Sequence, residues 1–379
     1  MTVPYWRLSG FYLFYYATLG AFVPYWTLYL AGLGFVPAEI GLLMAMMMMS
    51  RIVAPNVWAW IADHTGQRMR IVQLGSFAAA LAFIGVFFAK DFWWMALVVT
   101  SFSFFWNASL PQVEVTTFNH LGQEPHRYGG IRLWGSIGFI VCVVGLGPLL
   151  DRFGTSLLTW VLMVLFTAIW LSSLWVPERG LTYVQQEHLP LRETLSQRNV
   201  LALLIVCFLM QASHGPYYTF YSLYLQDHGY TRSAIGQLWA LGVIAEIGIF
   251  LIMPRLIPWF GLRALLLGSL GLAVVRWLMI GYFVNSVYML IVAQVLHAAT
   301  FGIYHGSAIQ LIHRYFRGRH QGRGQALYSS LSFGAGGAVG ALYSGYTWAI
   351  GGGVASFNTA ALVSVLALLF AWRGLKVDS

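Results

Sequence analysis

The chain has 379 residues, of which 59% are hydrophobic and only 9% are charged. Soluble domains carry roughly 25% charged residues, so the composition excludes an ordinary aqueous globule. The formal charge of +9 would suit a nucleic-acid binder, but the basic residues fall between apolar runs and mostly on one side of them. We therefore expect an integral membrane protein.

Twelve apolar stretches follow one another, each long enough for the roughly 20 residues that a bilayer-spanning helix needs. Their uninterrupted apolar runs predict helices, because the strands of a membrane barrel alternate apolar and polar residues. The fold class is thus predicted to be all-α. The predicted spans are residues 9–32, 38–62, 71–89, 93–119, 130–150, 155–176, 200–225, 233–257, 263–284, 287–312, 324–347 and 349–372.

The basic residues indicate how these spans are oriented. Of the 21 Lys and Arg residues, three lie in odd-numbered loops and three inside spans, which leaves 15 at the termini and around the even-numbered loops. The positive-inside rule then places both termini in the cytoplasm of a multi-pass protein of the cell inner membrane. The basic run between spans ten and eleven is interpreted as a topology anchor, with lipid head-group contact as the alternative: Arg314, Arg317, Arg319 and Arg323.

An internal repeat with an offset of 195 residues divides the chain into two halves. Many transporters are built from such repeats. We expect an N-terminal six-helix bundle over residues 1–176, a cytoplasmic linker over 177–199 and a C-terminal six-helix bundle over 200–379. The matched pairs are Gly20 with Gly215, Gly34 with Gly229, Ile40-Gly41 with Ile235-Gly236, Gly66 with Gly261, and Arg68 with Arg263.

The loop after the second span provides a family test. It reads Asp63-His64-Thr65-Gly66-Gln67-Arg68. Asp63, Gly66 and Arg68 match the D-R-x-G-R-R core of the major facilitator superfamily, which the six-plus-six arrangement also resembles, whereas His64 and Gln67 replace arginines. The resemblance implies a gating loop in which Asp63 and Arg68 form a latch between helices. A plain topology-setting loop is the alternative.

A closer resemblance covers most of the chain. Arg127-Tyr128-Gly129-Gly130-Ile131-Arg132-Leu133-Trp134-Gly135-Ser136, Ala240 to Glu246, Val275-Arg276-Trp277 and Leu296-His297 resemble the phenylpropionate-permease branch of that superfamily, which is related to lactose permease. The resemblance implies proton-coupled uptake of a small organic solute, such as 3-phenylpropionate or another aromatic acid, by a monomer. No cofactor, metal ion or nucleic acid is expected; the partners are the substrate, protons and the lipid bilayer.

Two opposite charges fall on neighbouring predicted spans. Glu114 lies in the latter half of span four and Arg132 near the start of span five. Charges inside a membrane are costly and usually find partners or face a polar path. In lactose permease a glutamate and an arginine at matching places contact the sugar, so the resemblance implies that Glu114 and Arg132 bind substrate. A structural ion pair between the two helices is the alternative.

Three ionisable groups fall on spans eight, nine and ten: Glu246, Arg276 and His297. A carboxyl group whose environment alternates between burial and a neighbouring cation can load and release a proton. The resemblance supports a proton-coupling role for all three. It also shows a departure, because Thr300 replaces a family glutamate one turn after the histidine. A neutral, hydrogen-bonded His297 is the alternative.

Further candidates for substrate binding are one cation and several aromatic residues. Arg51, in span two, occupies the repeat position equivalent to Glu246, and an interhelical ion pair is its alternative role. Aromatic rings can stack on a flat substrate, although they also fill cores and interface belts. The aromatic candidates are Tyr25, Trp26, Tyr218 and Trp239. Glycines of spans five and eleven are expected to let helices approach closely.

Other function classes remain as alternatives. An ATP-driven transporter needs a P-loop and an enzyme needs a catalytic cluster, and the sequence shows neither motif. Within the transporter class, a proton-coupled sugar or nucleoside symporter and an exporter that works as an antiporter remain open. A membrane sensor that binds ligand without moving it is the last alternative.

Overall fold

The computed structural model describes residues 3–89, 91–179, 192–316 and 321–375. Residues 180–191, which are most of the predicted linker, lie outside the described residues, as do Arg317 and Arg319 of the basic run. Every regular element within the described ranges is a helix. In the first half these are α1 Tyr5–Gly32, α2 Pro37–Thr65, α3 Arg68–Phe83, η1 Ile84–Phe88, α4 Phe92–Trp106, α5 Ser109–Leu121, η2 Pro125–Arg127, α6 Tyr128–Phe153 and α7 Leu157–Trp175.

The second half continues with helices of very different lengths. Two short segments, η3 and η5, are π-helical. The elements are α8 Arg192–Leu195, α9 Arg198–Ser213, α10 Gly215–Asp227, α11 Arg232–Tyr282, α12 Val287–Val295, η3 Ala298–Ile303, α13 Tyr304–Tyr315, α14 Gln321–Ser329, η5 Ser330–Gly336 and α15 Gly337–Gly374.

Within the described residues, eight helical stretches are long and apolar enough to cross a bilayer. Two of them, α11 and α15, contain a break where two helices meet, at Gly261 and at Gly351–Gly352. Gly261 has a φ of +74°, which favours glycine. Predicted spans eight and nine lie on either side of the first break. The second break falls within the first four residues of predicted span twelve, close to its boundary with span eleven. Span four is divided into α4 and α5, and span seven into α9 and α10.

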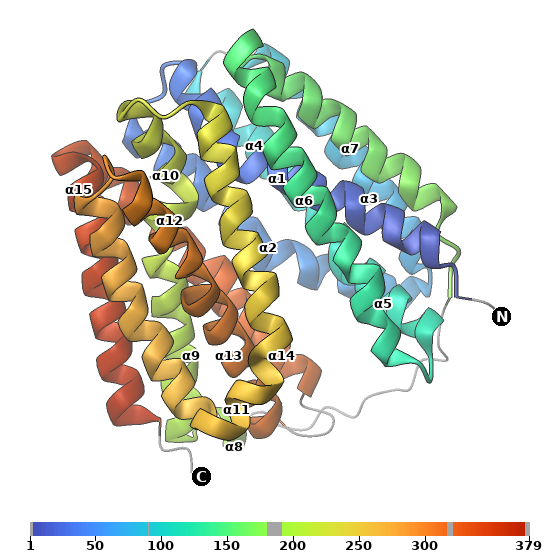
Figure 1. Ribbon diagram of the computed structural model, residues 1–379. Coiled ribbons are helices and arrows are strands. Elements are labelled where there is room, and N and C mark those ends of the chain that lie inside the picture. Colours follow the sequence, from blue (N-terminus) through green and yellow to red (C-terminus); the bar gives the residue numbers. More distant parts are fainter. Residues whose placement is uncertain (1–2, 90, 180–191, 317–320, 376–379) are drawn as a thin grey trace. The chain divides into compact units, whose positions relative to one another are not determined.

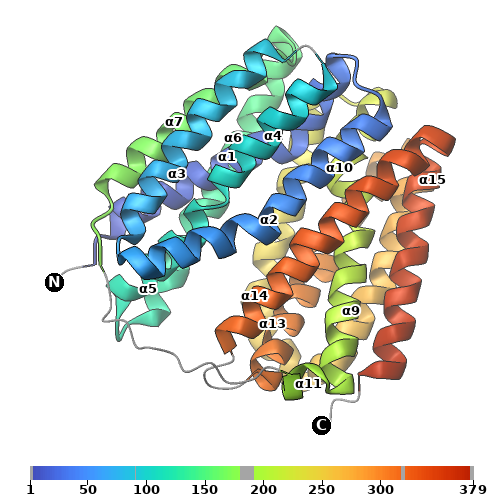
Figure 2. The ribbon, with the colours of Figure 1, turned by 180° about the vertical axis from the view of Figure 1, so that it is seen from behind.

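The chain forms two compact units. The first comprises Met1–Phe35, Met49–Val184 and Thr231–Gln237; the second comprises Val36–Met48, Gln185–Tyr230 and Leu238–Ser379. In the first unit α1 packs against α6 and α7, and α3 packs against α4, α5 and α7 (Figure 1). In the second unit α9 and α10 pack along α15 (Figure 2). The start of α2 belongs to the second unit and the start of α11 to the first.

Two glycines related by the 195-residue repeat lie in these exchanged segments. Within the second unit, a Cβ on Gly41 of α2 would lie 2.8 Å from the Cα of Gly345 on α15. Within the first unit, a Cβ on Gly236 of α11 would collide with the carbonyl oxygen of Val143 on α6. Glycine is needed at both contacts because no side chain fits. The repeat in the sequence is therefore also a repeat in packing.

Close helix packing also depends on glycines within each unit. In the first, Gly138 of α6 lies against the backbone of Leu13 on α1. In the second, Gly215 at the start of α10 lies against the backbone of Gly340 on α15, so that an added Cβ at either position would collide. The expectation that the glycines at 138 and 340 permit close approach is confirmed. Gly130, by contrast, has no atom nearer than 3.9 Å to such a Cβ.

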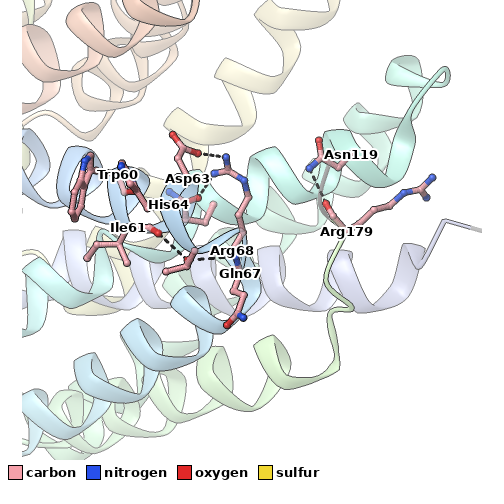
Figure 3. A network of polar contacts seen from close by, with 10 residues as sticks. Trp60, Ile61, Asp63, His64, Gln67, Arg68, Asn119 and Arg179 are labelled. Carbon is pink, nitrogen blue, oxygen red and sulfur yellow. Dashed lines mark hydrogen bonds and ion pairs between the residues drawn. The ribbon is translucent and has the colours of Figure 1, made fainter. Parts of the chain in front are cut away.

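The first residues of the predicted linker are held against the first unit. The side chain of Asn119, near the end of α5, donates to the carbonyl oxygen of Arg179 at 2.8 Å (Figure 3). The ring of His120 contacts the carbonyl oxygen of Pro177 at 3.0 Å. Between them, a carboxylate oxygen of Glu178 accepts the backbone N–H of Met69 in the first turn of α3 at 2.7 Å. The segment after α7 is thus tied to both α3 and α5.

Glu178 caps the N-terminus of α3, which has no capping side chain in its own sequence. The N-cap residue Gln67 makes no capping hydrogen bond through its side chain, and the first turn contains Arg68 and Arg70 but no acidic residue. The N-terminus of a helix carries partial positive charge, so two cations there are unfavourable and a carboxylate is favourable. Glu178 provides that carboxylate from 109 residues away in the sequence.

Replacing Glu178 with Gln is expected to loosen the start of α3. Loss of a charge at a helix N-terminus costs about 0.3–1 kcal/mol, which corresponds to amide exchange about two- to fivefold faster. Hydrogen–deuterium exchange of a peptide covering residues 67–75 measures this change. The control is Glu193→Gln, at an exposed position on α8. Equal exchange in both variants and the unaltered protein would contradict the capping role.

Gly215→Ala is expected to destabilise the second unit, because the new methyl group would collide with the Gly340 backbone. Overpacking of this kind costs about 1–3 kcal/mol. Thermal unfolding in detergent measures it as a lower midpoint. The matched control is Gly248→Ala on α11, where nothing lies within 4 Å of the added carbon. The unfolding midpoint of Gly248→Ala should equal or exceed that of the unaltered protein, because alanine favours a helix more than glycine does.

Candidate functional site

The predicted gating loop is a tight turn between α2 and α3. Gly66 has a φ of +67°, in the left-handed region that side chains disfavour. Across the turn, Arg68 forms an ion pair with Asp63 (Figure 3). The same guanidinium donates to the side-chain oxygen of Gln112 on α5 at 2.6 Å. The structure therefore brings the three predicted residues together, and Gln112 joins them.

Glu114 and Arg132 lie on consecutive helices of the first unit, α5 and α6. A short connection at residues 122–127 joins these helices, and there Arg127 donates to Glu124 at 2.6 Å and lowers the pKa of that carboxyl group. Glu114 and Arg132 form no ion pair within 4.0 Å of each other. Instead, Glu114 accepts a hydrogen bond of 3.3 Å from the hydroxyl of Tyr128.

Tyrosines surround the guanidinium group of Arg132. Its central carbon lies 3.7 Å from the ring centroid of Tyr16 and 5.8 Å from that of Tyr12, which are cation–π distances. Tyr128 packs edge-on against Tyr12 at 6.5 Å. These tyrosines were not predicted as site residues. Their signal in the sequence is the spacing of Tyr12 and Tyr16, which places both on one face of α1.

Arg51 belongs to the same region of the first unit. It lies half-buried in the middle of α2. The charges of Arg51, Glu114 and Arg132 all lie close enough to Tyr15 to act electrostatically on its hydroxyl group. Three of the charges singled out from the sequence thus gather around the tyrosines of α1.

Tyr25 and Trp26 take packing positions in the first unit. Both are fully buried. The hydroxyl of Tyr25 donates to the carbonyl oxygen of Val143 at 2.7 Å. The ring of Trp26 stacks on Phe22 with centroids 4.8 Å apart. The described contacts do not bring either residue to Arg132, and their role in substrate binding stays a prediction.

Arg276 is a fully buried cation in the second unit. Its three nitrogens donate to neutral oxygens: the Ala293 carbonyl at 2.8 Å, the Thr300 hydroxyl at 3.1 Å and the Gln294 side chain at 3.2 Å. Its guanidinium carbon also lies 4.2 Å from the ring centroid of Tyr217 and 4.6 Å from that of Trp277. Among the described residues no carboxylate forms an ion pair with it.

Glu246 and His297 form the acidic and basic pair of this unit. The Nε2 atom of His297 lies 3.7 Å from a carboxylate oxygen of Glu246. The side chain of Glu246 is 21% exposed and that of His297 only 6%. His297 directly precedes the π-helical segment η3, which contains Thr300. Such segments occur often at functional sites because they displace one residue from the regular helix.

Gln294 links the predicted residues of the second unit, although the sequence did not single it out. Its side-chain oxygen accepts from Arg276 and also from the hydroxyl of Tyr217 at 3.1 Å. Tyr217 in turn packs on Trp239 with centroids 4.6 Å apart, and Tyr218 stacks on Trp239 at 6.2 Å. The aromatic candidates Tyr218 and Trp239 thus border the cluster around Arg276. An uncharged Gln in an apolar helix gives a weak sequence signal, because amides also pack between helices.

The two groups of candidate residues, around Arg132 in the first unit and around Arg276 in the second, consist of charged, polar and aromatic side chains. Within the described ranges, no group of three or more His, Cys, Asp or Glu residues could hold a metal ion. The first unit presents a guanidinium group on an aromatic face. The second unit contains a carboxylate beside an imidazole and a buried guanidinium group. These groups can bind an anion and exchange a proton.

Comparisons with known proteins extend over nearly the whole chain. The model of the MFS_1 like family matches residues 5–359. The probable 3-phenylpropionic acid transporter of Escherichia coli (strain K12) is 31% identical over 375 residues and covers 96% of each chain. The maltose permease of Geobacillus stearothermophilus is 26% identical and covers 95% of this chain and 92% of its own.

The fold agrees with these sequence matches. A crystal structure of a mutant of the nucleoside transporter NupG superposes with a TM-score of 0.87. It covers 98% of this chain and 100% of that one, and its identity of 16% shows the fold alone. The all-helical membrane architecture is therefore that of the major facilitator superfamily. The protein belongs to the MFS_1 like family of this superfamily and is a secondary transporter, not an enzyme.

Proposed function

We propose that the protein takes up a small aromatic acid, such as 3-phenylpropionate, together with protons, by alternating access. The observation that carries this proposal is the guanidinium group of Arg132, which lies on the ring of Tyr16 and forms no ion pair with a carboxylate of the described residues. The name of the relative from Escherichia coli supports the solute class. The role of each residue below belongs to the same proposal.

The proposed topology has twelve spans in two six-helix bundles, residues 1–176 and 200–379, joined by a cytoplasmic linker. Eight stretches qualify as spans, and the breaks in α11 and α15 divide two of them in two. The helix α1 and the pair α4–α5 supply the remaining two. The basic residues support cytoplasmic termini in the inner membrane. We expect the protein to work as a monomer.

Arg132 is the proposed partner of the substrate carboxylate. It is half-buried, and its nitrogens make no hydrogen bond to a described residue. A guanidinium group binds a carboxylate through two parallel hydrogen bonds. The rings of Tyr12 and Tyr16 beside it offer flat apolar surface for an aromatic ring. Tyr128 holds Glu114 by a hydrogen bond, so Glu114 does not take the place of the substrate on Arg132.

Glu246 is the proposed proton carrier, with His297 and Arg276 setting its environment. The carboxylate is the more exposed partner of the pair, so it is the one that water can reach. Protonation of Glu246 would remove its electrostatic attraction to His297. The second unit would then have two states, one with Glu246 ionised and one with it protonated. The gating role of Asp63, Gly66 and Arg68 rests on their ion pair and turn.

Proton-coupled sugar uptake is the second candidate. The maltose permease is 26% identical along most of its length. The carboxylate of Glu114 can accept hydrogen bonds from sugar hydroxyl groups, and Arg132 can donate to them. Competition of sugars and aromatic acids for one uptake reaction separates the two candidates.

Arg132→Lys is expected to weaken binding of 3-phenylpropionate. It keeps the charge but loses the two-pronged geometry, and hydrogen bonds between charged groups contribute about 1.5–3 kcal/mol, so the KM for uptake should rise about tenfold or more. Initial rates of labelled uptake into proteoliposomes measure it. The control is Arg70→Lys, an exposed residue that contacts Gln67. An unchanged KM in the Arg132 variant would contradict the assignment.

Glu246→Gln is expected to separate transport from proton coupling. The amide cannot release a proton, so uptake driven by a pH gradient should fall to the level of protein-free liposomes. Exchange of labelled for unlabelled substrate needs no net proton movement and should persist. Protein-free liposomes correct for direct permeation of the neutral acid. Gradient-driven uptake that survives in the variant would show that another group carries the proton.

A further inference from the structure

His214 is a buried histidine that the roles above leave unused. It lies at the junction of α9 and α10, where one predicted span is divided into two helices. Its exposed fraction is 0%. The next residue, Gly215, lies against the backbone of Gly340, which fixes the junction within the second unit. The packing therefore holds the imidazole ring of His214 at a defined place.

Hydrogen bonding fixes which nitrogen of His214 carries its proton. The Nδ1 atom lies 2.9 Å from the carbonyl oxygen of Met210. A carbonyl oxygen only accepts, so Nδ1 must be the protonated nitrogen, and in the neutral ring Nε2 is then a bare acceptor. Nε2 is buried and makes no hydrogen bond to any residue that the structure describes. Buried acceptors of this kind cost free energy unless a partner satisfies them.

Three more buried atoms of neighbouring side chains make no hydrogen bond within 3.5 Å to a described residue: the Tyr221 hydroxyl, Nε2 of Gln294 and Nδ1 of His297. The Tyr221 hydroxyl and the Gln294 side chain nevertheless lie near enough to interact. All three residues contact Tyr217, with ring centroids 5.0 Å away for Tyr221 and 5.4 Å for His297, and a hydrogen bond of 3.1 Å to Gln294. The rings of His214 and His297 lie 6.4 Å apart. The side chains that carry these atoms are thus neighbours within the second unit.

The cluster offers both kinds of hydrogen-bonding group. Gln294 Nε2 can only donate, and His214 Nε2 accepts. A buried water molecule typically makes about three hydrogen bonds to such groups. The charged and titratable groups around it are Arg276, Glu246, His297 and the phenols of Tyr217, Tyr218 and Tyr221.

We propose that bound water joins Nε2 of His214 to Gln294 and His297, and that His214 is a positioning residue for proton coupling. It acts by holding this water against His297, the partner of Glu246, and it does not touch the substrate. The inference rests on the proposed proton-coupled uptake. It goes further by assigning a role to a histidine outside the Glu246, Arg276 and His297 group.

Two variants that remove the acceptor test this role: His214→Phe keeps a flat ring, and His214→Leu serves where the Phe variant does not fold. His214→Gln is the conservative variant, because its amide oxygen accepts. The matched control is His228→Phe, since His228 makes the same Nδ1 contact to the carbonyl four residues earlier, at 2.8 Å, but is exposed. Each variant is reconstituted as the full chain after size-exclusion chromatography.

Two readouts are compared, uptake of 3-phenylpropionate driven by a pH gradient and substrate exchange without a gradient. Loss of one buried hydrogen bond corresponds to a change of roughly tenfold in rate. The apolar variants should therefore show gradient-driven uptake about tenfold slower than the unaltered protein. Their rate of substrate exchange should stay within about twofold of it. His214→Gln and His228→Phe should keep both. This selective loss is the expected result.

Other outcomes overturn the inference in distinguishable ways. If the apolar variants match His228→Phe, or lose both readouts equally, His214 has only a packing role. If neither apolar variant folds, His214→Gln decides: unchanged coupling supports the water-holding role, and a selective loss contradicts it, because the acceptor is still present. If the unaltered protein shows no gradient-driven uptake above protein-free liposomes, the proposed function fails first.

Discussion

The constraint on which the structure depends is that a charge inside an apolar helix must find polar or aromatic partners. Arg276 shows how this is met. Neutral oxygens and aromatic faces surround its guanidinium group, and no carboxylate pairs with it among the described residues. The hydroxyl of Thr300 serves as one of the neutral acceptors. The carboxylate of Glu246 is left to interact with His297.

The same constraint gives the two units different capacities. In the first, the partners of Arg132 among the described residues are tyrosine rings, so its hydrogen-bonding edge is available to an anion. In the second, all nitrogens of Arg276 are already bonded, so this cation shapes the field around the Glu246–His297 pair instead of binding solute. Substrate recognition and proton handling are therefore proposed to be divided between the units.

The sequence predicted the all-helical membrane architecture, because the length of a bilayer crossing dictates long apolar helices, while the division into twelve spans stays a proposal. It did not predict the break at His214, because that break depends on Gly215 meeting Gly340 far along the chain. Nor did it reveal that Glu178 caps α3, or that Tyr16 lies beneath Arg132. Intramembrane charges are visible in a sequence because they are rare, whereas tyrosines, amides and glycines are common and gain meaning only from their contacts.

The central claim is that solute and protons move together, and it is tested most directly with the unaltered protein in proteoliposomes that contain a trapped pH-sensitive dye. Adding 3-phenylpropionate outside should acidify the interior faster than in protein-free liposomes, with a rate that saturates as the concentration rises. Labelled substrate followed in parallel gives the ratio of protons to solute. Saturable entry of substrate with no proton entry above that of protein-free liposomes would contradict the account.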